Sequence, residues 1–164
     1  MTIKLFDKQL FTQLAQAALD SPRLRSNHNV HDNLDEPVQR LFITLQPDSY
    51  VRPHRHSHKD KWEFFFMVSG ELSFLIFDQQ GELQQRHQLS ADGELRGLEI
   101  PYNTWHAVVA GDKPATFFEV KQGPYQPMDD KDFAHWSPAE NDIGVNQFVL
   151  QLKKLTPGER INIE

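Results

Sequence analysis

The stretch Arg52-Pro-His-Arg-His-Ser-His-Lys-Asp-Lys-Trp-Glu-Phe-Phe-Phe-Met-Val68 places two histidines two residues apart, followed by a carboxylate at the head of a very apolar run. On a β-strand, residues two apart project from the same face, so the imidazoles of His54 and His56 would lie on one side. The run that starts at Glu63 is typical of a strand buried on both faces. An ionised carboxylate in such a strand needs a cation or hydrogen-bond donors to compensate it.

A third histidine, His106, closes the later stretch Pro101-Tyr-Asn-Thr-Trp-His106. Three imidazoles and one carboxylate, if strand pairing brings them together, form a ligand set for a divalent transition metal. The alternative, four polar groups without a shared role, leaves a carboxylate uncompensated beside three phenylalanines. We therefore expect one metal ion to be bound by His54, His56, Glu63 and His106. Fe, Mn, Ni, Co and Zn all suit these ligands, and the sequence leaves the choice among them open.

The rest of the chain alternates short apolar runs with turn signals such as Ser69-Gly70 and Asp92-Gly93. Strands are expected at 38–45, 50–56, 62–68, 72–77, 84–89, 97–100, 106–110 and 116–121. This spacing predicts an all-β fold, a small barrel or two-sheet jelly roll, and not a βαβ protein. Apolar residues at helical spacing predict one helix over 7–19 and another over 145–155. The polar segment 23–36 is expected to form an ordered loop or short turn.

A chain of 164 residues is expected to form one structural domain with a substantial core. Residues 1–36 would form an N-terminal helix and an ordered loop packed on the barrel, 37–136 the metal-binding barrel, and 137–164 a C-terminal extension. The apolar face of the C-terminal helix must be buried. We expect it to pack on the exterior of the barrel, with docking across a dimer as the alternative.

Strand alternation predicts which side chains share the barrel interior with the metal ligands. The inward set, which would line a mostly apolar substrate pocket, is Tyr50, Arg52, Phe65, Met67 and Val108. Arg52 is expected to hold a carboxylate or phosphate of the ligand, because its planar guanidinium suits bidentate recognition of an oxyanion. The alternative is an Arg52 that is exposed or held in a structural salt bridge.

Four other residues are expected to lie outside the pocket. Trp62 and Trp105 are sequence neighbours of ligands, so they should point to the opposite face and belong to the outer core. Glu119 and Lys121 share one face of the last strand and could reach inward. Because that strand ends near the edge of the barrel, we expect both to be exposed to solvent.

The ligand spacing resembles the two sequence motifs of the cupin superfamily: His-x-His, six residues, Glu63, six residues, Gly70, and later Pro-x-Asn-x-x-His. Over 21–136 the chain resembles the WbuC-type cupin-fold metalloproteins, through the stretches Ser21-Pro-Arg-Leu-Arg25, Asp35-Glu-Pro-Val-Gln-Arg40, Arg52-Pro-His-Arg-His56, Lys61-Trp-Glu63 and Glu119-Val-Lys-Gln-Gly-Pro-Tyr125. This resemblance implies a small cupin β-barrel (double-stranded β-helix) with a metal cofactor. It also implies a link to surface-polysaccharide (O-antigen) biosynthesis, with a sugar or sugar-nucleotide as ligand and no established reaction.

The chain departs from the general cupin pattern at several points. Asp48 and Asn103 stand where glycine is usual, and Ala110 stands where asparagine is usual. Six residues, more than the usual number, separate His56 from Glu63. These departures leave all four expected ligands in place. Asn103 is the next-best residue after glycine for a turn position with positive φ.

The composition limits which kinds of binding partner and which cellular compartment are expected. Lys and Arg total 17 against 23 acidic residues, and the net charge of -6 argues against a nucleic-acid-binding surface. The absence of cysteine excludes disulfides and thiolate chemistry. The sequence has neither a continuous apolar stretch of ~18 residues nor an N-terminal signal-peptide pattern. We therefore expect a cytoplasmic protein with a small-molecule ligand, although the lack of cysteine would also suit the periplasm.

The strand expected at 62–68 is apolar on both faces, and one face alone can point into the barrel. The other face needs a cover. We expect a homodimer whose interface uses outward residues of 34–42 and 62–68, because two-fold contacts are the commonest among soluble oligomers and many cupins are dimers. The alternative is a monomer in which the terminal helices cover this face.

Two functional classes remain open. The first is an enzyme, an oxygenase or an isomerase or epimerase, and the second is a non-catalytic protein that uses the metal to hold an anionic metabolite. An inward Tyr, Glu or Lys beside the metal would favour the enzyme, because isomerisation needs an acid–base group. Tyr50 is the inward candidate. His28 and His31 are expected to cap backbone groups of their loop, with a role at the pocket mouth as the alternative.

Overall fold

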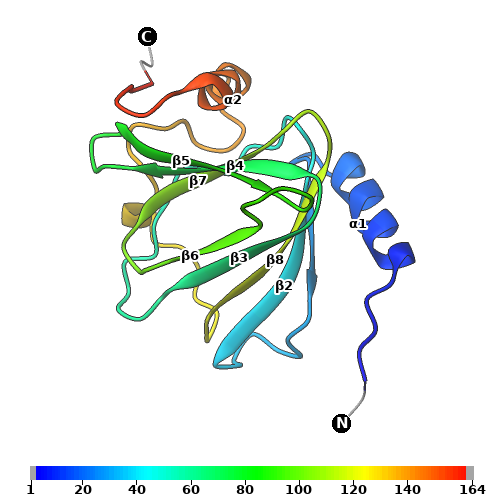
Figure 1. The fold of residues 1–164 in the computed structure, drawn as a ribbon. Coiled ribbons are helices and arrows are strands. Elements are labelled where there is room, and N and C mark those ends of the chain that lie inside the picture. Colours follow the sequence, from blue (N-terminus) through cyan, green and yellow to red (C-terminus); the bar gives the residue numbers. More distant parts are fainter. Residues whose placement is uncertain (1–2, 162–164) are drawn as a thin grey trace.

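Two antiparallel sheets face each other in the computed structural model, which describes residues 3–161 (Figure 1). The larger sheet has the order β1-β2-β8-β3-β6, with the strands Arg25–Asn29, Val38–Leu45, Ala115–Gln122, Glu63–Ser69 and Gly97–Ile100. The smaller sheet has the order β5-β4-β7, with the strands Leu83–Ser90, Glu71–Phe77 and Trp105–Ala110. The predicted all-β barrel of jelly-roll type is confirmed. The outermost residues of the segments 1–36 and 137–164 lie outside the described part of the chain.

Alternate residues of facing strands fill the space between the sheets. On β3, Phe65 and Met67 point inward and are buried, while Phe66 points outward and is 43% exposed. The ring of Phe65 packs against Phe74 of β4 and Phe117 of β8, with ring centroids 4.9 and 5.6 Å apart. Each buried side chain of this size contributes about 1.5–3 kcal/mol of transfer free energy. This packing fixes the separation of the sheets and therefore the positions of the polar groups that point inward.

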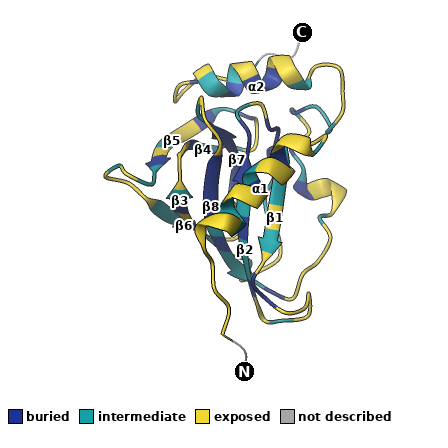
Figure 2. Cartoon of the chain, turned by 90° about the vertical axis from the view of Figure 1, so that its right-hand side faces the viewer, coloured by how far each residue is buried: buried dark blue, intermediate teal, exposed yellow. Residues whose placement is uncertain are grey.

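Helix α1 (Lys8–Asp20) packs on the outer face of the larger sheet, over β1 and β2 (Figure 2). The helix begins where the side chain of Asp7 accepts a hydrogen bond from the backbone N–H of Leu10, a typical N-cap. Its buried residue Leu14 packs against Phe42 of β2. The predicted amphipathic helix is confirmed.

Helix α2 (Val145–Lys154) covers the outer face of the smaller sheet (Figure 1). Phe148 and Leu152 of α2 are buried in one cluster with Leu75 of β4 and Ala107 of β7. The expected packing of this helix on the barrel's own exterior is confirmed.

The segment expected to be a loop at 23–36 contains an edge strand. Strand β1 pairs antiparallel with β2, from Arg25 opposite Leu45 to Asn29 opposite Leu41. Its sequence, Arg-Ser-Asn-His-Asn, has little intrinsic preference for a strand. The pairing with the strongly apolar strand β2 overrides this weak local preference, and the loop prediction was wrong here.

The strand expected at 50–56 does not form. Within this segment His54 alone forms isolated antiparallel β-bridges, one with His106 and one with Phe133. The segment is extended but lies between β7 and the short 3₁₀ helix η1 (Asp130–Asp132), so its hydrogen bonds go to two different partners. Pro53 lacks the N–H that a continuous ladder would use. The side-chain alternation assumed for this segment was therefore wrong.

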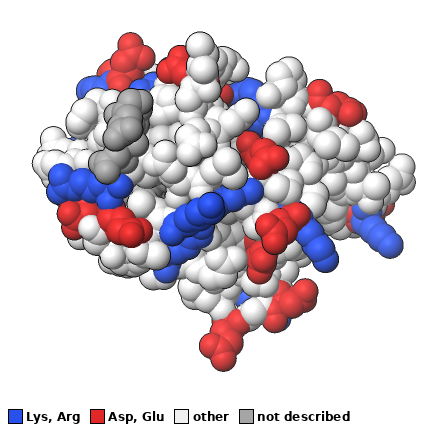
Figure 3. Space-filling view, turned by 90° about the horizontal axis from the view of Figure 1, so that it is seen from above, with Lys and Arg blue, Asp and Glu red and all other residues white. Residues whose placement is uncertain are grey.

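Acidic and basic side chains are interspersed on the face that carries α2 (Figure 3). Lys153 lies 3.5 Å from Asp48, and Arg160 lies 3.1 Å from Glu82, so these pairs connect the C-terminal extension to the barrel. Ion pairs as exposed as these contribute little to stability. Among the described residues, no helix combines the length and apolar character needed to cross a membrane.

Candidate metal centre

The two histidines that are far apart in the sequence are held together by their own backbones. The N–H of His54 donates to the carbonyl of His106 at 3.0 Å, and the N–H of His106 donates to the carbonyl of His54 at 2.8 Å. This pair of bonds places the two imidazoles side by side, with ring centroids 4.4 Å apart. Glu63, the first residue of β3, enters the same interior from the opposite sheet.

Both imidazoles use the same nitrogen to anchor themselves. His54 Nδ1 lies 2.8 Å from the carbonyl oxygen of Arg52, and His106 Nδ1 lies 2.9 Å from the carbonyl oxygen of Thr104. A carbonyl can only accept, so each Nδ1 carries the proton and each Nε2 keeps a free lone pair. Metal-binding histidines are commonly oriented in this way, with the distal nitrogen as the ligand.

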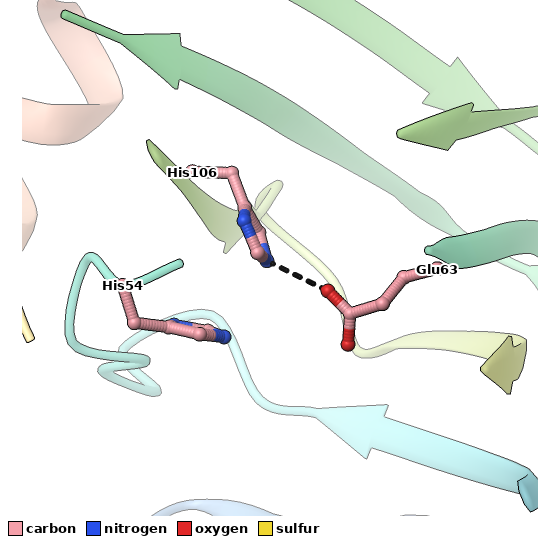
Figure 4. A group of neighbouring side chains, drawn as sticks. All are labelled: His54, Glu63 and His106. Atoms are coloured by element: carbon pink, nitrogen blue, oxygen red, sulfur yellow. Dashed lines mark ion pairs between the residues drawn. The ribbon is translucent and has the colours of Figure 1, made fainter. Parts of the chain in front are cut away.

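His54, Glu63 and His106 point toward one another from three different segments (Figure 4). One potential ligand atom from each residue lies within 4.8 Å of those of the other two. Glu63 Oε2 is 3.3 Å from His106 Nε2. Glu63 and His106 are almost completely buried, at 2% exposure each. This group can hold a metal ion.

The expected fourth ligand, His56, lies beside the other oxygen of Glu63. Its Nε2 is 3.0 Å from Glu63 Oε1, but the atoms are not aligned for a hydrogen bond. As a result, His56 Nε2 and Glu63 Oε2 are both buried without a hydrogen-bond partner among the described residues. Buried polar atoms in this state are costly. A cation between imidazoles and carboxylate would satisfy them.

The protonation states also suit metal binding. Burial, together with the neighbouring histidines, lowers the pKa of His54 to about 3, and burial lowers the pKa of His106. Burial alone would raise the pKa of Glu63, but the contact with His56 and the charge of Lys121 outweigh it and hold that pKa below its usual range. At neutral pH the site therefore offers neutral imidazoles and an ionised carboxylate, the forms that bind transition metals. The residues present fit a divalent ion.

The site opens into a cavity of about 430 Å³ between the sheets. Phe65 and Val108, two of the predicted pocket residues, line this cavity. Met67 is buried in the core between the sheets and does not line it. Trp62 was expected on the outer face but lines the cavity, because it precedes β3 and is not bound by the alternation of that strand.

Tyr50 and Arg52 face the C-terminal extension and not the cavity. The hydroxyl of Tyr50 donates to the carbonyl of Pro138 at 2.8 Å. The guanidinium of Arg52 donates to the carbonyls of Ala134 and Ser137, each at 3.2 Å. These contacts give both residues a structural role, because the segment 50–56 lacks the strand alternation that would turn them inward.

Two polar residues that were expected to be exposed lie in the cavity beside Glu63. Lys121 Nζ is 3.4 Å from Glu63 Oε1 and in contact with Glu119 Oε1 at 2.6 Å, and Glu119 is 5% exposed. Burial and the neighbouring charge of Glu63 raise the pKa of Glu119. Burial would lower the pKa of Lys121, but the carboxylates of Glu119 and Glu63 raise it on balance. The signal in the sequence was their shared face with the apolar Phe117 on β8.

A family model described as a domain of unknown function (DUF6016) matches residues 6–89, about half of the chain. The chain belongs to the DUF6016 family. None of the curated proteins matches the sequence significantly.

Solved structures similar to this chain include cupin proteins. An oxalate oxidase in complex with the substrate analogue glycolate is 17% identical, with a TM-score of 0.50, and the match covers 64% of this chain and 54% of that one. The DMSP lyase DddQ from Ruegeria pomeroyi DSS-3 is 16% identical, with a TM-score of 0.50 and coverage of 63% and 49%. A cupin_2 domain of an XRE family transcriptional regulator from Enterobacter cloacae is 19% identical, with a TM-score of 0.49 and coverage of 62% and 98%. At such identities the likeness shows the fold alone, and this fold is a small cupin β-barrel.

The turn before His106 explains one departure from the general cupin pattern. Asn103 has a φ of 64°, in the left-handed region that favours glycine and, next to it, asparagine. Its backbone N–H donates to the carbonyl of His56 at 2.7 Å. The turn therefore connects the strand that carries His106 to the segment that carries His54 and His56. The positive-φ position expected at Asn103 is confirmed.

Proposed function

We propose that this chain is a metal-dependent enzyme that acts on a small anionic or carbonyl-bearing metabolite. His54, His56, Glu63 and His106 would hold one divalent transition metal at the inner end of the cavity. A bound divalent ion would polarise a carbonyl or carboxylate oxygen or acidify a bound water. Three neutral imidazoles and one carboxylate leave such an ion with a net charge of about +1, which favours an anionic ligand.

The observation that carries this proposal is the place of Lys121. Its ammonium lies beside Glu63 and lines the cavity, so a ligand that reaches the metal also reaches Lys121. An ammonium has three N–H donors, and Lys121 donates one of them to Glu63 Oε1, while its contact with Glu119 is an ion pair. A remaining donor can bind an oxygen of the ligand. We therefore assign to Lys121 the recognition of an oxyanion that we had expected of Arg52.

The cavity walls support chemistry on a small substrate more than simple storage of an ion. Phe65, Val108 and Phe117 give the cavity an apolar lining beside the metal-site residues. In such a setting charge–charge interactions are stronger than in water. Isomerisation and epimerisation need an acid–base group next to the reacting carbon. The presence of Lys121 and Glu119 beside the metal site therefore favours an enzyme over the alternative, a non-catalytic binding protein.

The resemblance to WbuC-type cupins supports a narrower version of this proposal. In that version the metabolite is a sugar or sugar-nucleotide used in surface-polysaccharide biosynthesis. The stretches that carry the resemblance include the metal ligands His54 and His56 and the pair Glu119 and Lys121.

Metal analysis of the purified protein tests the proposal. We expect wild-type protein, expressed with added transition metals and purified without chelator, to contain close to one transition-metal ion per chain. The variant His106→Ala should lose most of that metal and remain folded, whereas His135→Ala, which changes an exposed histidine outside the site, should keep it. Wild-type protein without a bound transition metal would overturn the proposal.

A further inference from the structure

The cavity has a second polar position on the side away from the metal ligands. Gln39 of β2 lines the cavity and is 2% exposed. The strand register places Gln39 directly opposite Lys121 of β8, and Lys121 directly opposite Glu63 of β3. The three polar residues therefore form a straight row across three adjacent strands, on the inner face of the larger sheet.

The orientation of the Gln39 amide is fixed. Its Nε2 donates to the backbone carbonyls of Leu34 and Glu36, at 3.2 and 2.9 Å. Two carbonyl oxygens can be satisfied only by the NH₂ end of an amide, so the assignment of nitrogen and oxygen is unambiguous. Both N–H groups are thus used by the segment before β2, and the carbonyl oxygen Oε1 is directed away from it. Among the described residues, none donates a hydrogen bond to Oε1.

A neighbouring side chain shows the same pattern. His31 lines the cavity and is 6% exposed. It follows the last residue pair of β1 and β2, and the backbone N–H groups of Val30 and His31 both donate to the carbonyl of Arg40. His31 Nδ1 lies 2.9 Å from the carbonyl oxygen and 3.0 Å from the backbone nitrogen of Arg40, while its Nε2 is buried without a partner among the described residues. The end of the cavity near Gln39 therefore contains two polar groups that are held by the backbone on one side and lack a partner on the other.

The row of Gln39, Lys121 and Glu63 indicates how far apart the polar groups of a ligand lie and which groups they are. Adjacent strands lie about 4.8 Å apart, so the backbones of Gln39 and Glu63, two strands apart, are separated by roughly 10 Å. The middle of the row and its end at Glu63 offer positive groups, Lys121 and the proposed metal, which bind oxyanions. The other end offers the Gln39 carbonyl, which accepts a hydrogen bond from a hydroxyl group.

We propose that Gln39 is a specificity-determining residue of this cavity and that the ligand is a hydroxylated carboxylic acid of about the size of a sugar acid. Its carboxylate end lies at Lys121 and the metal site, and a hydroxyl group farther along the chain donates to Gln39 Oε1. This inference rests on the proposed metal site. It narrows the substrate class to molecules with a hydroxyl group at a distance from the acid, and excludes short acids as the preferred ligands.

Two probes with the same metal-binding end test this inference. Glycolate and D-gluconate both present a carboxylate with a hydroxyl on the adjacent carbon, and only gluconate has further hydroxyl groups along its chain. Isothermal titration of each into metal-replete wild-type protein gives the ratio of their dissociation constants. We expect gluconate to bind at least about fivefold more tightly than glycolate, the contribution of one buried hydrogen bond.

Two variants of Gln39 separate recognition from a structural role. Gln39→Met and Gln39→Glu both lose the donors to Leu34 and Glu36, but Gln39→Glu keeps an acceptor oxygen at the end of the side chain. We expect Gln39→Met to abolish the preference for gluconate and Gln39→Glu to retain most of it. Glycolate affinity, metal content and thermal unfolding midpoint, measured on the same samples, show how far each change affects the fold and the metal site.

The possible results are distinct. Equal affinity for glycolate and gluconate in wild-type protein, or equal loss of the preference in both variants, would overturn the role of Gln39 and leave the metal site standing. Failure of metal-replete wild-type protein to bind glycolate would instead overturn the proposed function on which the inference rests. A preference for gluconate that is lost in Gln39→Met and kept in Gln39→Glu supports the proposed role of Gln39.

Discussion

Glu63 holds its two carboxylate oxygens in different surroundings, Oε1 beside His56 and Lys121, and Oε2 beside His106. It is the ionised residue that all the neighbouring imidazoles and the ammonium share. A change at this position would therefore act on a bound metal ion through charge more than through shape.

Glu63→Gln keeps the volume of the side chain and removes its negative charge. We expect the affinity for a divalent metal to fall by more than about tenfold, since changes in the outer partners of metal ligands already cause losses of that order. Competition with a chromogenic chelator measures the affinity. Glu99→Gln is the matched control, because Glu99 is an exposed carboxylate on the adjacent strand β6. Equal affinity in wild type and Glu63→Gln would show that Glu63 is not a ligand.

Asn103 gives a prediction about the backbone at the site. Because its φ is 64°, a β-branched residue would be strained there, whereas glycine would adopt this conformation freely. We expect Asn103→Val to lower the free energy of unfolding by about 1–2 kcal/mol and to weaken metal binding, because the turn donates to the carbonyl of His56. Asn103→Gly should retain both properties. Urea unfolding measures the free energy of unfolding, and competition with a chelator measures the metal affinity. Equal values for Asn103→Val and Asn103→Gly would contradict this prediction.

The sequence predicted part of the site and missed another part for identifiable reasons. His54, Glu63 and His106 were recognisable because ligand-type residues stood at unusual places, above all a carboxylate at the head of an apolar strand. Glu119 and Lys121 were expected in solvent because their strand ends near the edge of the barrel. The sequence does not show that β8 lies between β2 and β3, and this central place buries both of them.

At the scale of elements, periodicity predicted the strands and helices that have a clear apolar face. Val38–Leu45 and Glu63–Ser69 are examples in which alternation or continuous apolar character was evident. Strand β1 and the segment around His54 were misassigned in opposite directions. In both cases the backbone hydrogen-bond partner decides whether a strand forms. The edge of β2 makes a strand of β1, whereas the segment around His54 pairs with two different short segments and remains irregular. Tertiary pairing of this kind has no signature in local sequence.

Helix α2 yields a prediction that separates stability from metal binding. Leu152 is completely buried in the cluster between α2 and the smaller sheet. We expect Leu152→Ala to reduce the free energy of unfolding by about 2–5 kcal/mol, the range for removing a buried leucine side chain. Leu150→Ala, on the same helix but 48% exposed, should change it by less than about 0.5 kcal/mol. Denaturant unfolding gives these values.

Metal content is the second measurement on these two variants. The cluster that contains Leu152 shares no residue with the lining of the cavity. The folded fraction of Leu152→Ala should therefore bind as much metal per chain as wild type. A folded Leu152→Ala protein without metal would show that α2 is coupled to the site.

At the scale of the whole molecule, each sheet has one helix on its outer face, and the cover of the larger sheet is incomplete. Helix α1 packs over β1 and β2, where Phe42 is 8% exposed. Phe64 and Phe66 of β3 stack on each other, with ring centroids 6.3 Å apart, and Phe66 is 43% exposed. Leu34 and Val38, also in the expected interface region, are 49% and 37% exposed. The part of the expected interface around Phe42 is thus already covered within the chain.

We propose that the remaining open part of this face, around Phe64 and Phe66, forms the contact of a homodimer. Stacked aromatic residues on an open sheet face, here the half-buried Phe64 and the exposed Phe66, are typical of protein–protein contacts, and a two-fold contact buries the same face of both subunits at once. Sedimentation equilibrium at micromolar concentration should therefore give twice the 19.1 kDa mass of the chain. Phe66→Glu should shift the protein to the monomer, because it would place two like charges in a desolvated contact. Leu150→Glu, at an exposed apolar residue of α2 on the other sheet, should leave the dimer intact. Wild-type protein that sediments as a single species of monomer mass would rule the dimer out.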